Sequence, residues 1–405
     1  MNGLIQFVRF AQGSAAIVLR GSRQYWTWVG LLLLVIATGV AAYTNQLTHG
    51  LIVSNMRDPM SWGFYIGNFA FFVGVAAAAV ILVVPAYVYQ WGPIREVVLL
   101  GEIMAISAII MCMLFVAVDV GRPDRLWHLF PGVGLPNFPS SILVWDILVL
   151  NAYFAVNFFV VTYIVFKSYM GQPYKPEFVY PIVFLSIPLA IGIHTVTAFL
   201  FMGLKSRPFW NTAILAPRFI SSAFCSGPAL MIIIFRVLRA VSPIPISNAA
   251  LRKIGELLGY AMAANLFFLG CEVFEQFYAP TRHTIHAEFQ WFGLQEHGIA
   301  VYTWFALVCN SAAFLIFGIS RLRDRINVLT VGCVLAVAGV FIEKGLGLLL
   351  PGLTPDMLGE VYRYAPSLNE VLVAAGVWSI GALFFTLMAR VAMAITLGEF
   401  RYQQK

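Results

Sequence analysis

Ten long apolar segments constrain this chain more than any other feature of its sequence. Each is about 18 residues or longer and mainly apolar, which is the length an α-helix needs to cross about 30 Å of hydrocarbon. Lipid cannot hydrogen-bond to the backbone, so a spanning segment must satisfy its own backbone groups, as a helix does. We therefore predict an all-α membrane protein with transmembrane helices at residues 25–44, 62–90, 97–119, 142–168, 179–203, 213–240, 256–279, 297–319, 326–350 and 369–396.

The composition supports an integral membrane protein. Of the 405 residues, 60% are hydrophobic and 11% are charged, whereas soluble domains carry about 25% charged residues. The net charge of +7 does not indicate nucleic-acid binding, because the basic residues mark loops and form no patch. No clear small-residue cleavage site follows the apolar segment near Trp26. We expect this segment to be retained as the first helix and not removed as a signal peptide.

The lysines and arginines indicate how the helices are oriented. With ten spans, 16 of the 25 lysines and arginines fall on the side of the N-terminus, and nine fall on the other side. Basic residues are enriched in cytoplasmic loops. We therefore predict a multi-pass protein of the cytoplasmic (inner) membrane with both termini in the cytoplasm. The loop before residue 142 is expected at the external face.

The sequence also contains signs of an internal repeat within a single membrane domain. The third helix begins with Leu100-Gly101-Glu102 and the seventh with Ile254-Gly255-Glu256, and in both helices acidic residues follow near the other end. Internal repeats are common in membrane proteins of this size. We expect two related four-helix bundles, at 62–203 and 213–350. An N-terminal segment with helix 1 (1–61) and helix 10 with a cytoplasmic tail (369–405) flank them.

The charged stretch between Asp119 and Asp146 is the strongest candidate for a functional site. The two carboxylates are expected at the same face, with Trp127-His128 between them and Trp145 and Tyr153 close by. An acid and an imidazole beside aromatic rings suit a flat redox-active ring, because quinol oxidation needs a base near each ring oxygen. The competing hypothesis is a loop that Arg–Asp pairs fold, with Arg122 or Arg125 bonded to Asp119 or Asp124.

Other ionisable residues lie inside the predicted helices. A charge in the bilayer costs at least about 2.5–3.5 kcal/mol on insertion scales, so such residues are functional candidates. This group contains Glu102, His194, Glu256, Glu272, Glu275, His297, Glu343 and Lys344. Glu102, Glu256 and His297 could equally lie near helix ends, where water reaches them. Glu343 and Lys344 could be structural. His194 could bond to a neighbouring helix, contribute to a quinone pocket or relay protons.

The cofactor-binding residues of common redox centres are missing from the sequence. A membrane-embedded haem needs paired histidines on facing helices, and only His194 lies well inside a predicted span. The five cysteines all lie in apolar segments without a C-x-x-C pair, whereas iron–sulfur clusters need grouped thiolates. We therefore expect no haem, no iron–sulfur cluster and no metal site in this chain, and interpret the cysteines as buried structural thiols. No glycine pattern indicates nucleotide binding.

Several motifs together resemble a known family. They lie at 121–128 (GRPDRLWH), 62–66 (WGFYI), 145–146 (WD), 207–211 (RPFWN) and 216–219 (APRF). In this combination the chain is similar to the NrfD/polysulfide reductase membrane-subunit family. Within that family it is most similar to the ten-helix DsrP/HmcC-type subunits of sulfate- and sulfur-metabolising complexes.

The resemblance implies a quinone-binding subunit without a redox centre of its own. Such a subunit exchanges electrons between the quinone or menaquinone pool and a ferredoxin-like iron–sulfur subunit at the external face. Further membrane and cytochrome subunits of the same complex are expected. It would act within a multi-subunit oxidoreductase and not as an enzyme alone.

The resemblance also suggests roles for individual residues. It assigns quinone binding to Asp146 and also to His128, Tyr65 and Asp119, and the motif residues Trp62 and Arg122, with Tyr153 and His194, complete the expected pocket. Proton transfer would involve Glu102, Glu272, Glu275 and His297. Two other functions remain open. A secondary transporter also has repeated bundles and buried acids, although Pro85, Pro188 and Pro228 do not match between the halves. A purely structural anchor would tolerate changes at Asp146 and Glu272.

Overall fold

The computed structural model of the chain describes residues 2–130, 132–281, 283–294, 298–356 and 358–402. This described part is helical, without a β-strand apart from one isolated bridge between Arg57 and Met60. It contains ten helices that are long and apolar enough to cross a membrane, which confirms the predicted fold class. The spans are Arg23–His49, Phe64–Val88, Val98–Asp119, Ile142–Tyr169, Pro176–Met202, Leu215–Val241, Asn248–Tyr278, Ala300–Gly318, Ile326–Leu353 and Leu368–Thr396.

Eight of the spans form two rings of four helices. The first bundle contains α3 (Phe64–Ala77), α6 (Val98–Asp119), α7 (Ile142–Tyr169) and α8 (Pro176–Met202), each packed against two others. The second contains α9 (Leu215–Val241), α10 (Asn248–Tyr278), α12 (Ala300–Gly318) and α14 (Ile326–Lys344). Helix α9 contacts α3 and α8 and thereby joins the two bundles.

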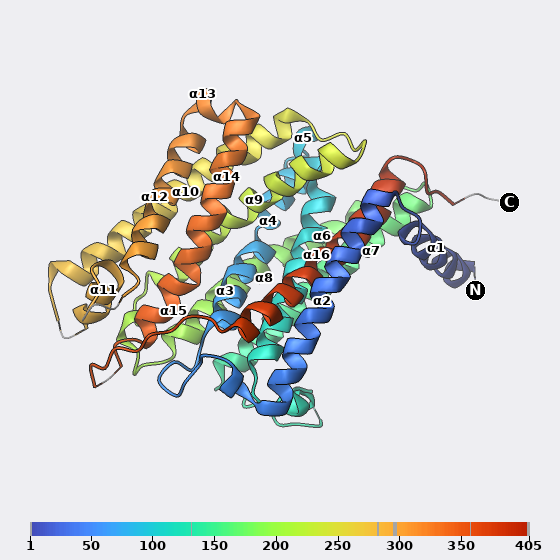
Figure 1. The fold of residues 1–405 in the computed structure, drawn as a ribbon. Helices are drawn as coiled ribbons and strands as arrows, with labels where there is room; N and C mark the ends of the chain where they lie inside the picture. Colours follow the sequence, from blue (N-terminus) through green and yellow to red (C-terminus); the bar gives the residue numbers. More distant parts are fainter. Residues whose placement is uncertain (1, 131, 282, 295–297, 357, 403–405) are drawn as a thin grey trace.

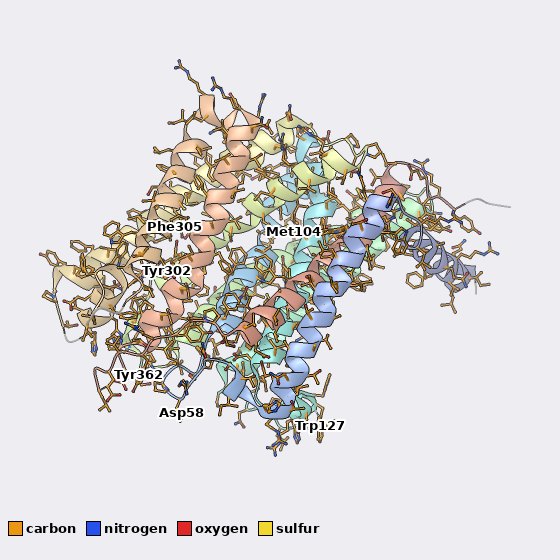
Figure 2. All side chains as sticks on the ribbon, viewed as in Figure 1. Asp58, Met104, Trp127, Tyr302, Phe305 and Tyr362 are labelled. Atoms are coloured by element: carbon orange, nitrogen blue, oxygen red, sulfur yellow. The ribbon has the colours of Figure 1, made fainter. Side chains whose placement is uncertain are left out.

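The first and last spans lie outside these rings. Helices α2 (Arg23–His49) and α16 (Leu368–Thr396) run side by side, and α16 packs on α6 (Figure 1). Residues 2–22 and 397–402 lie at one end of the molecule, which we call the terminal face (Figure 1). The opposite end carries residues 120–130, 132–141, 204–214, 279–281, 283–294, 354–356 and 358–367, and we call it the loop face. On the outer surface, Tyr302 and Phe305 of α12 project away from the helices, as lipid-facing side chains do (Figure 2).

Two spans predicted as continuous helices are interrupted. In the second span, α3 is followed by α4 (Val80–Val83) and a π-helical turn (Val84–Val88) that contains Pro85. Proline has no N–H to donate to the helix, and its presence is a common cause of kinks and irregular turns in helices. The ninth span breaks at Gly345, between α14 and α15 (Leu346–Leu353). Short helical segments complete the chain: α5 (Gly92–Arg95), α11 (Thr284–Trp291) and α13 (Ser320–Arg323), with 3₁₀ turns at Leu51–Val53, Pro123–Leu129 and Pro208–Trp210.

Helix α1 (Asn2–Val18) precedes the first span and was not predicted from the sequence. It packs on α16 and α7 at the terminal face. Its Phe10 ring is buried against Phe166 and Tyr169, while Leu4 and Val8 are exposed. An amphipathic helix with a free apolar side suits the headgroup boundary of a membrane.

Glycines allow α2 and α16 to approach closely. A Cβ atom added at Gly39 would lie 2.7 Å from the Cα atom of Gly376, and backbone cannot move aside as a side chain can. Small residues commonly permit such contacts between membrane helices. We expect Gly39→Leu to force the helices apart and to cost about 1–3 kcal/mol, measured as a lower melting temperature of the purified protein. Gly30→Leu is the matched control, because a Cβ there meets nothing within 4 Å. Equal melting of the two variants would contradict this packing.

Candidate functional site

Asp146 lies inside the first bundle, near the loop face. It is the fifth residue of α7, and only 4% of its surface is exposed. The hydroxyl group of Thr197, on the neighbouring helix α8, donates a hydrogen bond of 2.8 Å to Oδ1 of Asp146. One turn earlier in α8, His194 is also buried, with Nδ1 3.0 Å from the Ala190 carbonyl oxygen and Nε2 without a partner. The pair of helices α7 and α8 therefore holds a carboxyl group that can accept or donate a proton away from bulk water.

The loop that carries His128 lies outside this buried region. His128 is exposed in the 3₁₀ turn Pro123–Leu129, and its ring centroid is 3.9 Å from that of Trp127. Trp127 points away from the helices at the outer end of the loop face (Figure 2). Arg122 forms an exposed ion pair of 2.9 Å with Asp124, and this hydrogen bond lowers the pKa of the Asp124 carboxyl. The Arg–Asp pair is the contact that the loop-folding hypothesis expected.

Asp119 belongs to a different polar cluster, between α2, α3 and α6. The Tyr65 hydroxyl donates a hydrogen bond of 2.8 Å to Gln46, and Gln46 donates one of 2.7 Å to the carbonyl oxygen of Val118. Next to this chain of bonds, Oδ1 of Asp119 is buried without a hydrogen-bond partner. The structure therefore places Tyr65 near Asp119, whereas Asp146 is bonded to α8.

Glu370, at the start of α16, is the centre of a structural network beside this cluster. It is fully buried, and it accepts hydrogen bonds from the Tyr364 hydroxyl (2.5 Å) and from the backbone N–H groups of Asn55 (3.0 Å) and Ser367 (2.8 Å). The Tyr364 hydroxyl in turn accepts from the Phe64 N–H at 2.6 Å. Burial and the nearby Glu370 carboxylate raise the pKa of Tyr364. These bonds tie residues 364–367 to the start of α3 in the first bundle.

Two aromatic residues of the expected pocket have packing contacts. Trp62 packs against Phe201 and Trp210, with ring centroids 5.3 and 5.8 Å away. Tyr153 is fully buried in α7, and its hydroxyl donates a hydrogen bond of 3.3 Å to the Ala76 carbonyl oxygen. Both residues stabilise the helices around the site, and the structure shows no hydrogen bond from either to Asp146.

The second bundle contains a buried ion cluster. Arg218 of α9 pairs with Glu272 of α10 and, at 3.1 Å, with Glu343 of α14. Glu343 also accepts hydrogen bonds from the amides of Asn265 (3.3 Å) and Asn310 (2.9 Å). The cluster therefore draws on all four helices of the bundle, and its acids are paired as buried charges require.

Lys344 adds a second base to this cluster. Its Nζ atom lies 3.3 Å from the ring centroid of Phe219 and 3.4 Å from the Phe219 carbonyl oxygen. Two bases, Arg218 and Lys344, thus stand beside two acids, Glu272 and Glu343.

Arg218 lies within the predicted span 213–240 but was not among the ionisable residues that we singled out: it is the fourth residue of α9 and 8% exposed. Pro217 could have indicated this, because proline is favoured in the first turn of a helix.

The remaining candidates are scattered. Glu102 is buried in the terminal-face half of α6, 3.5 Å from the Tyr87 hydroxyl. Glu256 forms a partly exposed ion pair with Lys253. Glu275 lies on the outer side of α10, one turn beyond Glu272. His297 lies outside the described residues. Within the described ranges, no group of three His, Cys, Asp or Glu side chains is arranged to hold a metal ion.

The described part of the chain has ten candidate spans and is therefore a polytopic membrane protein. Most of its buried acidic side chains lie near the loop face. A family model for polysulphide reductase, NrfD, matches residues 52–355. The chain belongs to this family, which confirms the family resemblance seen in its motifs.

Curated relatives match along nearly the whole chain. A putative membrane subunit of dimethyl sulfoxide reductase from Halobacterium salinarum is 28% identical over 397 residues, covering 88% of each chain. A subunit of selenate reductase from Mesobacillus selenatarsenatis is 22% identical over 404 residues, covering 90% of this chain and 92% of the relative. The integral membrane subunit of an Hdr-like menaquinol oxidoreductase from Archaeoglobus fulgidus is 23% identical over 381 residues, with the same coverage.

Proposed function

We propose that the chain is the quinone-reactive membrane subunit of a multi-subunit oxidoreductase. It would exchange electrons between the quinone pool, with menaquinone as the favoured species, and an iron–sulfur partner subunit docked on the loop face. The relatives support the coarser part of this proposal, because their names describe subunits of reductases and of a menaquinol oxidoreductase. The buried Asp146–Thr197 pair is the observation in this structure that supports it most directly.

The chemistry of this pair fits a quinol. A bound quinol supplies two electrons and two protons, and a nearby base must take each proton as the electrons leave. Asp146 can accept a hydrogen bond and then a proton from a ring hydroxyl, while Thr197 occupies one carboxylate oxygen and fixes the orientation of the group. Its 4% exposure keeps bulk water from competing for that proton.

The finer parts of the proposal concern orientation and protons. The excess of lysine and arginine on the terminal face supports placing both termini in the cytoplasm, so the loop face would be external. The Glu102–Tyr87 pair in the terminal-face half and the Arg218–Glu272 pair in the loop-face half are candidate positions for proton transfer. The motifs shared with DsrP/HmcC-type subunits support a place in sulfur metabolism.

The test is purification of the chain together with its associated subunits. We expect extracted lipid to contain quinone, the complex to reduce the iron–sulfur partner on addition of quinol, and the chain alone to show no haem Soret band and no bound iron. A stoichiometric haem in this chain would overturn the cofactor proposal. A solitary protein that moves solutes and transfers no electrons would favour the transporter.

A further inference from the structure

A lipid-facing groove lies on the second bundle, away from Asp146. It has a volume of about 600 Å³ and runs between α10 and the segment at 212–214 that precedes α9. Gly270 and Cys271 line it, with the rings of Phe267 and Phe274 on either side and Thr212 and Glu275 at its polar end. We call it the α10 groove.

The α10 groove is open to hydrocarbon. Phe267 is 66% exposed and Phe274 is 62% exposed, on a helix face that would otherwise contact lipid. Gly270 contributes no side chain, and a Cβ atom added there would meet nothing within 4 Å. The groove is therefore a notch in the outer surface of α10, with a size in the range of small-molecule sites, about 300–1,000 Å³.

The polar end of the α10 groove adjoins a second, polar cleft. The Thr212 hydroxyl donates a hydrogen bond of 3.0 Å to Oε2 of Glu275. The same two residues also line a cleft of about 720 Å³ on the loop face, together with Gln276 and His283. The Thr212–Glu275 pair thus stands where an apolar groove ends and a polar one begins.

We propose that the α10 groove is a second quinol-binding site, with the isoprenoid tail along Phe267 and Phe274 and a ring hydroxyl on Glu275. The choice of ligand rests on the proposed function, but the site does not. A carboxylate accepts a hydrogen bond from a neutral quinol hydroxyl, whereas it repels the phosphate of a phospholipid. Aromatic side chains also pack well against a flat ring. The groove lies on α10 of the second bundle, and Asp146 lies on α7 of the first.

The thiol of Cys271 gives a direct readout of occupancy. Cys271 is partly exposed in the groove, whereas Cys112, Cys225, Cys309 and Cys333 are buried. A maleimide should therefore label Cys271 first in the purified complex. The probe is 2-heptyl-4-hydroxyquinoline N-oxide, a quinol analogue that keeps its hydroxyl without added reductant. We expect it to slow labelling, and phosphatidylglycerol at the same concentration to have no effect. Equal protection by the phospholipid, or none by the analogue, would overturn the proposal.

Two variants and one control distinguish the α10 groove from the region around Asp146. Glu275→Gln replaces the charged acceptor with a neutral one, so protection of Cys271 should require about tenfold more analogue, because hydrogen bonds to charged groups are stronger than neutral ones. Gly30→Leu, on the lipid-facing side of α2, should leave protection unchanged. Protection should also survive Asp146→Asn, and its loss in that variant would mean that the two regions form one site. If Asp146→Asn retains turnover while Cys271 is still protected, the proposed function fails and the second site stands.

Discussion

Replacement of Arg218 with methionine should strongly destabilise the second bundle. Arg218 pairs with both Glu272 and Glu343, and all three side chains are at most 10% exposed. Methionine would leave two buried acids with only Lys344 as a counter-charge. Breaking a buried pair by removing one partner costs about 3–5 kcal/mol, which is a large part of the stability of a typical protein. We expect a low yield of monodisperse protein and a clearly lower melting temperature.

Two further variants test the cause of this loss. In Arg218→Met/Glu272→Gln, one acid and one base remain in the cluster, so the balance of charge is restored and much of the stability should return. Arg122→Met is the matched control, because its pair with Asp124 is more than half exposed and such pairs contribute about 0–1 kcal/mol. Normal melting of Arg218→Met would show that the ion cluster does not hold the bundle together.

The spans could be predicted from the sequence because the signal is local. A run of apolar residues of spanning length needs no knowledge of its neighbours, and the ten predicted segments match the ten observed ones. Helix α1 was missed because it is amphipathic and, with 17 residues, shorter than the length used to identify a span. The break at Gly345 was missed because α15 is as apolar as the helix before it, and its contacts with α3 and α11 cannot be read from the sequence.

The candidate site could be predicted only in part. Charged residues inside apolar runs identified Asp146 and Glu272 as buried acids, since burial follows from the run itself. Their partners could not be found in this way. Thr197 is a neutral residue among many, and Arg218 lies so close to the start of its helix that its burial could not be told from the sequence. The sequence does not tell which helices become neighbours, because that depends on tertiary packing. Asp119 therefore lies near Tyr65 and Gln46, whereas Asp146 is bonded to Thr197.

The largest functional effect is expected for Asp146→Asn. Asparagine has nearly the same shape and can still accept the hydrogen bond from Thr197, so the complex should assemble with its partner subunits. The amide cannot take up a proton, however, and loss of a positioned general base typically costs about 10²–10⁴-fold in rate. We expect quinol-dependent electron transfer to fall by a factor in this range, measured as reduction of the partner subunit in the purified complex.

A control variant distinguishes loss of the base at Asp146 from a general loss of negative charge. Asp324→Asn removes a carboxylate that is about half exposed beside Arg252, away from the proposed docking face, and it should leave turnover unchanged, so a general effect of lost negative charge can be recognised. Because Asp146 is buried and its only described hydrogen bond comes from Thr197, a structural role predicts at most a change in melting temperature. Near-normal turnover of Asp146→Asn in a fully assembled complex would therefore show that quinol is oxidised elsewhere, and the α10 groove would become the first place to look.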